Sequence, residues 1–352
     1  MAGVKVVRVG ANLPMTGGLA LHNGLIQEGI KFAIEESESA GDSAVKLDVD
    51  WRDNEGDPSR AAAIFRKQFL NPPNIYVSGF EIQYNAIADE IKRKGIPNFV
   101  WTFAPFINRD SKHNFRVVHS YKQEPRLFFQ YADFKKPKKV YLLWYKLPHT
   151  LYEFEEVVAP ELRRSGIEVK SQPFDIGKKD FKDVVVKINK YNPDLIIASG
   201  WAMHLTEILK AARPYGLLED GKAVFSYDFS ELAAVLDKDE IEGMPFAAAS
   251  AFTRPGSAAK KWLKRLEARF KKPPHYFQLF TYDMVLVIND AARRLRESSS
   301  AWPPSSEEWI AALRATDIPG VTGQLKFDDD GSLITPVEVA VFRDGKPVPY
   351  FE

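Results

Sequence analysis

Residues 74–101 read NIYVSGFEIQYNAIADEIKRKGIPNFVW, and this stretch decides the fold. Two mostly apolar runs, 74–78 and 96–101, have the length of buried strands, and the run between them at 85–94 has helical spacing. Apolar strands that are separated by single helices predict a parallel sheet with helices on both faces. The stretch therefore predicts an α/β fold.

The same alternation extends toward the N-terminus. We expect strands at 4–11 and 47–51, and helices at 24–37 and 57–69. Asp57-Pro58 defines the start of the second helix, because Asp is a favoured N-cap residue and Pro suits the first helical position.

A second series of strands and helices begins near Tyr121. Its expected helices and strands cover 125–134, 139–144, 152–165, 167–171, 180–190, 195–199, 204–213 and 223–226. The C-terminal part is expected to be mostly helical and to close with strands: 257–270, 276–296, 306–315, 323–327, 337–342 and 347–351. Asp344-Gly345 is typical of a hairpin turn between the last two strands.

Length and composition exclude several classes of protein. At about 150 residues per domain, 352 residues predict two domains. Lys+Arg is 48 and Asp+Glu is 47, so a net charge of +1 gives no bulk attraction to nucleic acid or to an anionic membrane. No apolar run approaches the roughly 18 residues of a membrane span. The absence of cysteine excludes disulfides, thiolate zinc sites and cysteine nucleophiles.

Motifs of catalysis and metal binding are missing from the sequence. It has no phosphate-binding or dinucleotide-binding glycine motif, no nucleophile elbow and no H-E-x-x-H. No two of the six histidines lie within four residues of each other, so no helix supplies a pair of metal ligands. We interpret Glu153, Glu155 and Glu156 as a solvated helix face, and Asp328-Asp329-Asp330-Gly331 as a surface turn. We expect no cofactor.

Tryptophans gather at the ends of predicted strands. Trp101, Trp144 and Trp201 stand at or just past strand C-termini, and Trp51 ends the second strand. Open α/β sheets bind ligands at this edge, and amphipathic rings there favour a binding site over a catalytic one.

The ordered set of motifs resembles type I periplasmic solute-binding proteins of the Leu/Ile/Val-binding family, which serve branched-chain amino acid ABC transporters. The likeness covers nearly the whole chain in order. The segments that carry it are VGANLPMTGG at 9–18, QEGI at 27–30, DNEGDP at 53–58, KDF at 179–181, NPDLI at 192–196, TYD at 281–283 and GQLKFD at 323–328.

The resemblance implies two doubly wound parallel-sheet lobes joined by three crossovers, with the ligand between them. We expect the crossovers near 119–122, 250–252 and 329–336. Lobe one is then 1–120 plus 252–330, and lobe two is 121–251 plus 331–352.

The resemblance also implies the ligand-binding positions. Those of the first lobe are His22 after the first strand, Glu81 or Gln83 after the third, and Trp101, Thr102 and Phe103 after the fourth. Those of the second lobe are His149 or Tyr152, Trp201, and Tyr227 with Asp228, the acid that would pair with an ammonium group. A Glu where the family has a small hydroxyl residue would repel a carboxylate, and the positions are rich in aromatics. An aromatic or amine-bearing solute is therefore expected as readily as a branched-chain amino acid.

The function implied is capture of a small solute by lobe closure and delivery to an ABC permease, with no chemical change and no nucleic acid partner. The N-terminus Met1-Ala2-Gly3 is then expected to belong to a periplasmic or extracellular membrane-associated protein whose signal peptide has been removed. Two alternatives stay open: a cytoplasmic regulator of the same fold that senses amides or amino acids, and an α/β enzyme with a catalyst built from His22, Glu81 and Asp228.

Overall fold

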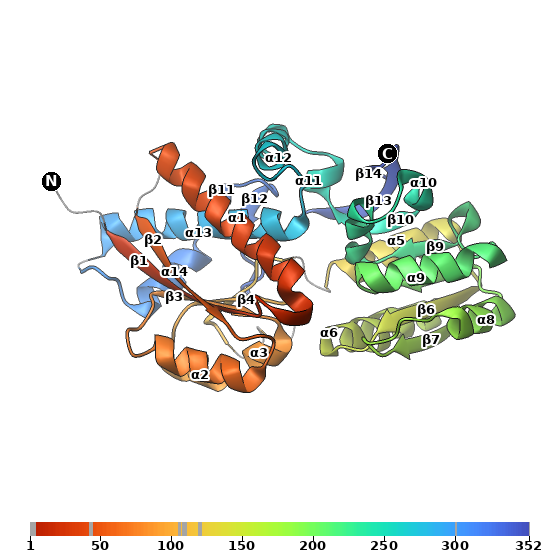
Figure 1. Ribbon diagram of the computed structural model, residues 1–352, viewed down its shortest axis with the longest axis horizontal. Coiled ribbons are helices and arrows are strands. Elements are labelled where there is room, and N and C mark those ends of the chain that lie inside the picture. Colours follow the sequence, from red (N-terminus) through yellow and green to blue (C-terminus); the bar gives the residue numbers. More distant parts are fainter. Residues whose placement is uncertain are drawn as a thin grey trace. The chain divides into compact units, whose positions relative to one another are not determined.

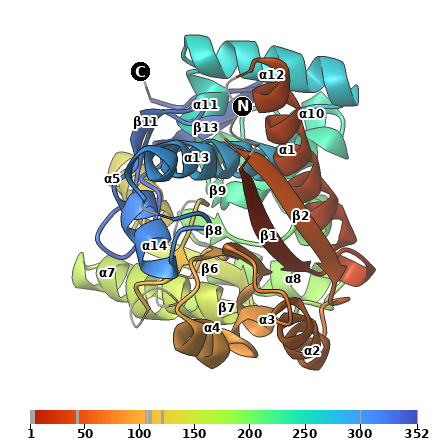
Figure 2. The same cartoon turned by 90° about the vertical axis from the view of Figure 1, so that its left-hand side faces the viewer.

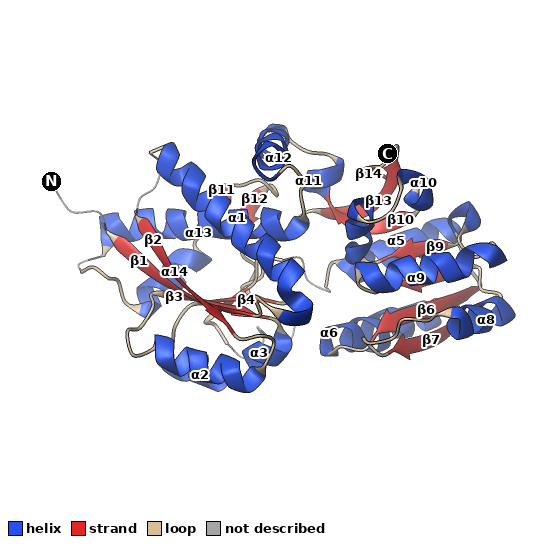
Figure 3. Cartoon of the chain, in the orientation of Figure 1, coloured by secondary structure: helices blue, strands red, loops and turns tan. Residues whose placement is uncertain are grey.

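The computed structural model describes residues 5–41, 45–104, 107, 111–118, 122–299 and 301–351. The chain divides into two units, Met1–Ser120 with Gly256–Thr335, and Tyr121–Pro255 with Pro336–Glu352. In each unit helices flank a central, mostly parallel sheet (Figure 3). This is the expected α/β fold with two doubly wound lobes.

Two short segments lie in other units than expected. Residues 252–255 lie in the second unit, because Thr253 and Arg254 bond Glu338 of strand β13 (Val337–Arg343). Residues 331–335 lie in the first unit, where the N–H of Leu333 donates to the carbonyl of Arg116 at 2.7 Å.

The sheet of the first unit has the order β2-β1-β3-β4-β5, and all its strands are parallel. Its strands are β1 (Val6–Leu13), β2 (Lys46–Asp53), β3 (Ile75–Gly79), β4 (Asn98–Trp101) and β5 (Asn114–Phe115). A separate antiparallel pair is formed by β11 (Asp317–Pro319) and β12 (Gln324–Lys326).

Helices cover both faces of this sheet. They are α1 (Ala20–Ser39, after the 3-10 turn η1, Gly17–Leu19), α2 (Pro58–Gln68), α3 (Glu81–Asn85), α4 (Ala88–Lys94), α12 (Ser257–Phe270), α13 (Tyr276–Ser298) and α14 (Ser306–Arg314). Helices α1 and α13 lie on one side, and α2, α3 and α4 lie on the other (Figures 1 and 2). Helix α2 begins as predicted, since the Asp57 carboxylate accepts the N–H of Arg60 at 2.7 Å.

Close packing of α1 on α13 depends on Gly29. A Cβ at this position would lie 2.6 Å from the carbonyl oxygen of Gln278 and would also meet the hydroxyl of Thr281, both on α13. Gly24, one and a half turns earlier on α1, has no neighbouring atom within 4 Å of such a Cβ. The two glycines of the helix therefore have different roles.

The second sheet has the order β14-β13-β10-β9-β8-β6-β7. Its strands are β6 (Lys139–Tyr145), β7 (Glu168–Phe174), β8 (Leu195–Ala198), β9 (Ala223–Phe225), β10 (Pro245–Ala249), β13 and β14 (Lys346–Pro349). β13 and β14 are antiparallel and form the expected hairpin, in which Asp344 and Gly345 both have positive φ. β13 is also antiparallel to β10, and the remaining pairs of this sheet are parallel.

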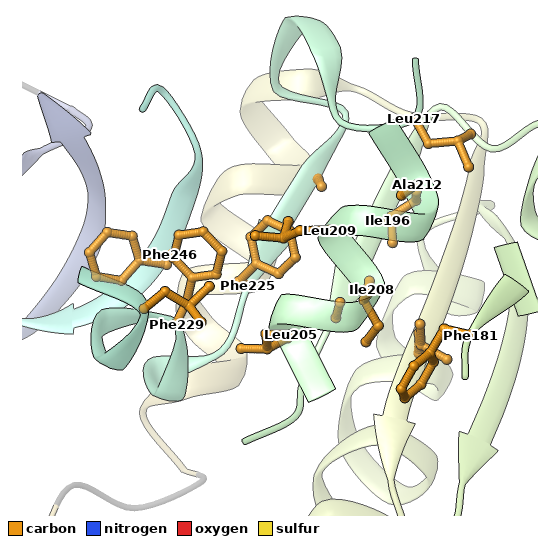
Figure 4. Packing of buried hydrophobic residues seen from close by; sticks show 14 of the residues in the cluster. Phe181, Ile196, Leu205, Ile208, Leu209, Ala212, Leu217, Phe225, Phe229 and Phe246 are labelled. Carbon is orange, nitrogen blue, oxygen red and sulfur yellow. The ribbon is translucent and has the colours of Figure 1, made fainter. Parts of the chain in front are cut away.

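The helices of the second unit follow its strands. They are α5 (Glu124–Lys135), α6 (Pro148–Leu151), the π-helix η3 (Tyr152–Val158), α7 (Ala159–Arg164), α8 (Lys182–Tyr191), α9 (Ala202–Ala212), the 3-10 turns η4 (Arg213–Tyr215), η5 (Glu219–Gly221) and η6 (Tyr227–Ala234), α10 (Lys238–Ile241) and α11 (Ser250–Thr253). Leu205 and Leu209 of α9 pack in one cluster with Phe225, Phe229 and Phe246 (Figure 4).

Two predicted helices are wrong in their details. The helix expected at 85–94 is α4, which begins only at Ala88, and the separate short helix α3 ends before it at Asn85; the helix expected at 152–165 runs from α6 through η3 to α7. Pro160 explains the second difference, because it has no N–H to donate to Glu156 and its ring would clash with that carbonyl in a regular α-helix. The wider π-turn ends just before it, with the N–H of Ala159 bonded to the carbonyl of Phe154.

The other expected helices and strands are confirmed in type and order, and the sequence patterns missed β5, β10 and β11. β5 has two residues and β11 three, and β10 (PFAAA) lacks the β-branched residues that mark strands.

We predict opposite effects for alanine at the two glycines of α1. Gly29→Ala forces a methyl group into α13 and should lower the free energy of unfolding by about 1–3 kcal/mol. Gly24→Ala meets no neighbour and should raise it by about 0.5–1 kcal/mol. Urea unfolding followed by circular dichroism measures both. Equal effects of the two variants would contradict the close packing of α1 on α13.

Candidate functional site

The strand orders place a ligand-binding edge in each unit. The first sheet follows the doubly wound order, in which β1 lies between β2 and β3, and β6 lies between β7 and β8 in the same way in the second sheet. Ligands of such sheets bind outside the carboxyl ends of the strands at this switch point. We call the residues after β1, β3 and β4 the first edge, and those after β6, β8 and β9 the second edge.

A chain of hydrogen bonds organises the first edge. The Thr102 hydroxyl donates to the Glu81 carboxylate at 2.6 Å and accepts the N–H of Ala104 at 3.0 Å. Thr102 and Glu81 are buried, with 1% and 4% exposure. The structure thus brings together two residues that were predicted separately. Glu81 is hydrogen-bonded within its own unit.

Buried Arg116 lies behind this chain. Its guanidinium donates to the carbonyl of Ala104 at 2.5 Å and also to the hydroxyl of Ser332. Burial lowers the pKa of Arg116 to about 10, against the opposing effect of acids that include Glu81. The group stays a cation at neutral pH and offsets the charge of Glu81. The sequence analysis missed Arg116, which stands in an unremarkable run, NFRVVHS.

Aromatic rings form the rest of the first edge. Trp101 is 1% exposed and packs edge-on against Phe277 at 5.4 Å between ring centroids. His22, half-buried on α1, meets the same ring at 5.2 Å. Phe103 is buried, and the amide of Gln83 donates to the carbonyl of Gly56 at 2.6 Å. Trp101 therefore packs the end of β4 against α13, and Gln83 joins α3 to the loop before α2.

The second edge presents one indole. Trp201 is the N-cap residue of α9, and its backbone N–H donates to Nδ1 of His204 at 3.2 Å. Its half-buried ring lies 6.0 Å from the ring of Tyr145, whose hydroxyl is 3.1 Å from Nε2 of buried His149. Tyr152 is half-buried at the start of η3. These five aromatic residues come from the ends of β6 and β8 and from the helices that follow them.

Tyr227 and Asp228 follow β9 and are buried. The N–H of Tyr227 donates to Oε1 of Glu124 at 2.6 Å. Glu124 and Glu153 are 1% and 0% exposed, and the sequence analysis missed both. The interpretation of Glu153 as part of a solvated face is wrong, because Glu153 is buried on the π-turn η3; Glu156 on the same turn is exposed. A proline inside a predicted helix is the sequence signal that could have indicated the irregular turn on which Glu153 lies.

The tryptophan pattern is only partly informative. Trp144 is 1% exposed, stacks on Phe154 and donates to the hydroxyl of Ser171, so it belongs to the core and not to an edge. Trp51 is half-buried beside Lys31.

Apolar side chains, which the sequence analysis did not single out, are exposed at both edges. Ile82 follows β3, Leu151 follows β6 and Met203 follows β8, and each is about half exposed. Groups of this kind, beside aromatic and polar residues, are typical of a surface that meets a ligand or a partner.

Other features do not compete with the edges as ligand sites. A cavity of about 490 Å³ in the second unit is lined by residues that precede β9 and β10, at the opposite ends of the strands. Within the described residues, no group of three His, Cys, Asp or Glu side chains could hold a metal ion. In the same part of the chain, no helix has the length and apolar character to cross a membrane.

The fold and the two edges define a two-unit α/β binding protein. A profile of periplasmic binding proteins matches residues 6–346, so the chain belongs to the periplasmic binding protein family. A search of curated protein sequences gave no match.

Solved structures show the same fold at low sequence identity. An ABC transporter substrate-binding protein from Sphaerobacter thermophilus is 17% identical, with a TM-score of 0.84 and coverage of 98% of this chain and 97% of the other. A leucine-binding protein from Thermotoga maritima is 20% identical, with a TM-score of 0.81 and 97% of both chains covered. A solute-binding protein from Rhodopseudomonas palustris in complex with 3,4-dihydroxybenzoic acid is 20% identical, with a TM-score of 0.82 and coverage of 97% and 95%.

We predict that the hydroxyl of Thr102 stabilises the first edge. Thr102→Val keeps the shape but deprives buried Glu81 and the Ala104 N–H of a partner, which should lower the free energy of unfolding by about 1–3 kcal/mol. Thr102→Ser keeps both hydrogen bonds and should cost clearly less. Urea unfolding of the three proteins measures this. If serine and valine destabilise equally, methyl packing and not the hydrogen-bond chain is responsible.

Proposed function

We propose that this chain captures a small organic solute outside the cytoplasm and delivers it unchanged to the permease of an ABC importer. The chain belongs to the periplasmic binding protein family, and both of its sheets have the same switch point in their strand order. The observation that supports the proposal most strongly is that polar and aromatic residues lie at the carboxyl edges of both sheets.

The proposed binding residues are those that stand at the two edges. On the first edge they are His22, Glu81, Gln83, Trp101, Thr102 and Phe103, and on the second His149, Tyr152, Trp201, Tyr227 and Asp228. We propose that the solute contacts residues of both edges and that its binding stabilises a closed form. Solute shifts that balance only by binding the closed form more tightly than the open one.

The chemistry of the edges favours an aromatic or amine-bearing solute. The half-buried indole of Trp201 offers a stacking face, and Asp228 offers a carboxylate to a cation. Relatives of the same fold include one solved with isoleucine and others with benzoate or dihydroxybenzoic acid, so the fold accommodates both amino acids and aromatic acids.

We predict that a thermal-shift screen identifies the solute. The panel contains amino acids, aromatic acids, amides and amines, and a true ligand at 100 times its Kd adds about 2.7 kcal/mol to the stability of the folded protein. The bound compound should be recovered intact by mass spectrometry after long incubation, because no chemical step is proposed. A compound that is converted would contradict the transport role.

We predict that two variants of the second edge lose this response. Trp201→Ala and Asp228→Asn should each weaken binding about 30-fold or more, because each removes about 2 kcal/mol or more of contact with the solute. Trp302→Ala is the control, since Trp302 is half-buried near the amino end of β1 and donates to the carbonyl of Val6. Retained binding in both edge variants would remove the site assignment.

A further inference from the structure

Two stretches that lead from the first unit to the second are bonded to each other inside the first unit. The chain passes between the units after 120 and again after 335. A few residues before these points, Arg116 and Ser332 form a parallel bridge. The N–H of Arg116 donates to the carbonyl of Gly331 at 2.8 Å, and the N–H of Leu333 donates to the carbonyl of Arg116 at 2.7 Å. We call residues 331–335 the crossover segment.

The close approach of the two stretches depends on Gly331. Its φ is +79°, and a Cβ at this position would lie 2.5 Å from the carbonyl oxygen of Asn114. Arg314 of α14 joins the same stretches from outside, since its guanidinium donates to the carbonyl of Asp329 at 3.0 Å and to that of Lys112 at 3.3 Å. Backbone and side-chain bonds therefore hold the crossover segment against the end of the first sheet.

The side chain of Arg116 connects this pairing to the first edge. It is 0% exposed, and its guanidinium donates to the carbonyl of Ala104 at 2.5 Å and also to the hydroxyl of Ser332. Within the described residues its Nε–H has no acceptor, so the two terminal NH₂ groups hold the guanidinium in place. Both acceptors are uncharged, so the arrangement depends on the planar fork of the guanidinium as well as on its charge.

Ala104 is bonded on both sides. Its carbonyl accepts from Arg116, and its N–H donates to the hydroxyl of Thr102, which in turn donates to Glu81. The result is a continuous path of buried hydrogen bonds from the proposed solute-binding residues Glu81 and Thr102 to Ser332 of the crossover segment.

Buried hydrogen bonds in such a series are not independent, because a group released at one end leaves the next group without a partner. If the Ser332 hydroxyl moves away, the guanidinium keeps only one of its two acceptors and holds the Ala104 carbonyl less tightly. If the segment around Thr102 loosens, the guanidinium is held less tightly against the crossover segment. A coupling free energy of this kind acts equally in both directions.

We propose that Arg116 is a positioning residue that couples the segment 102–104 to the crossover segment, so that a solute bound at 102–104 tightens the crossover segment and movement of the crossover segment loosens 102–104. The inference rests on the proposed function for the role of 102–104 in solute binding. The coupling itself is tested without a solute, so its failure and a failure of the solute screen are separate results.

We predict that Ser332→Ala loosens the first edge. The change removes one hydroxyl and leaves the backbone bonds of the crossover segment in place. Hydrogen exchange at the Ala104 amide should accelerate about 3–10-fold, which corresponds to about one hydrogen bond. Ser37→Ala is the control, since it removes a half-buried hydroxyl that bonds Asn289 in the same unit and should leave the Ala104 rate unchanged. Amides of β1 in the same samples report any change in global stability.

Arg116→Lys separates the coupling from the charge. Lysine keeps a cation beside Glu81 but lacks the planar fork that bonds two acceptors. In the Arg116→Lys protein, a further Ser332→Ala change should leave the Ala104 exchange rate nearly unchanged, because the path is already broken. If Ser332 acted only through packing, Ser332→Ala would give the same acceleration with and without Arg116→Lys.

Two results would overturn the proposal: an unchanged Ala104 exchange rate in Ser332→Ala, or equal accelerations by Ser332→Ala with and without Arg116→Lys. If Arg116→Lys does not fold, the reverse direction provides the second test. Thr102→Val should accelerate exchange at the Leu333 amide about 3-fold or more, and Thr102→Ser clearly less. An unchanged Leu333 rate in Thr102→Val would equally contradict the coupling.

Discussion

The structure depends on one constraint: parallel strands end together at one edge of their sheet, and polar groups buried there must bond one another. Thr102, Glu81 and Ala104 meet this requirement on the first edge, and Glu124 with the N–H of Tyr227 meets it on the second. The loops that follow the strands are therefore fixed by short hydrogen bonds between segments far apart in sequence. Such fixed loops are the preorganised surface that a binding protein needs.

The two edges differ in charge. On the first, the buried cation Arg116 offsets Glu81, so the acid there need not repel an anionic group of a solute. On the second, Asp228 stands beside two further buried acids. A solute with an aromatic body and a cationic end would match the second edge best. This asymmetry is a property of the side chains and not of the fold, because the strand order is the same in both sheets.

The fold was predictable from local signals, and the buried polar contacts were not. Asp57-Pro58 predicts the start of α2, and Asp344-Gly345 predicts the turn between β13 and β14. By contrast, Glu153 is buried on the π-turn η3, which ends just before Pro160 and which a regular helical projection does not represent. Trp144 precedes the end of β6 by one residue, and its side chain lies on the face of the sheet that η3 covers, where it stacks on Phe154. The position of a residue at a strand end predicts which edge of the sheet it lies near. The face to which its side chain points depends on the register of the strand, which the sequence pattern does not give.

The most direct test of the central claim is a crystal structure of the protein with a solute identified by screening. We expect the solute to contact the segment 101–104 of the first edge and also Trp201 or Asp228 of the second, with its chemical structure unchanged. A solute that occupies the cavity beside Arg213 and Arg343 at the opposite ends of the strands, and that touches neither edge, would contradict the account.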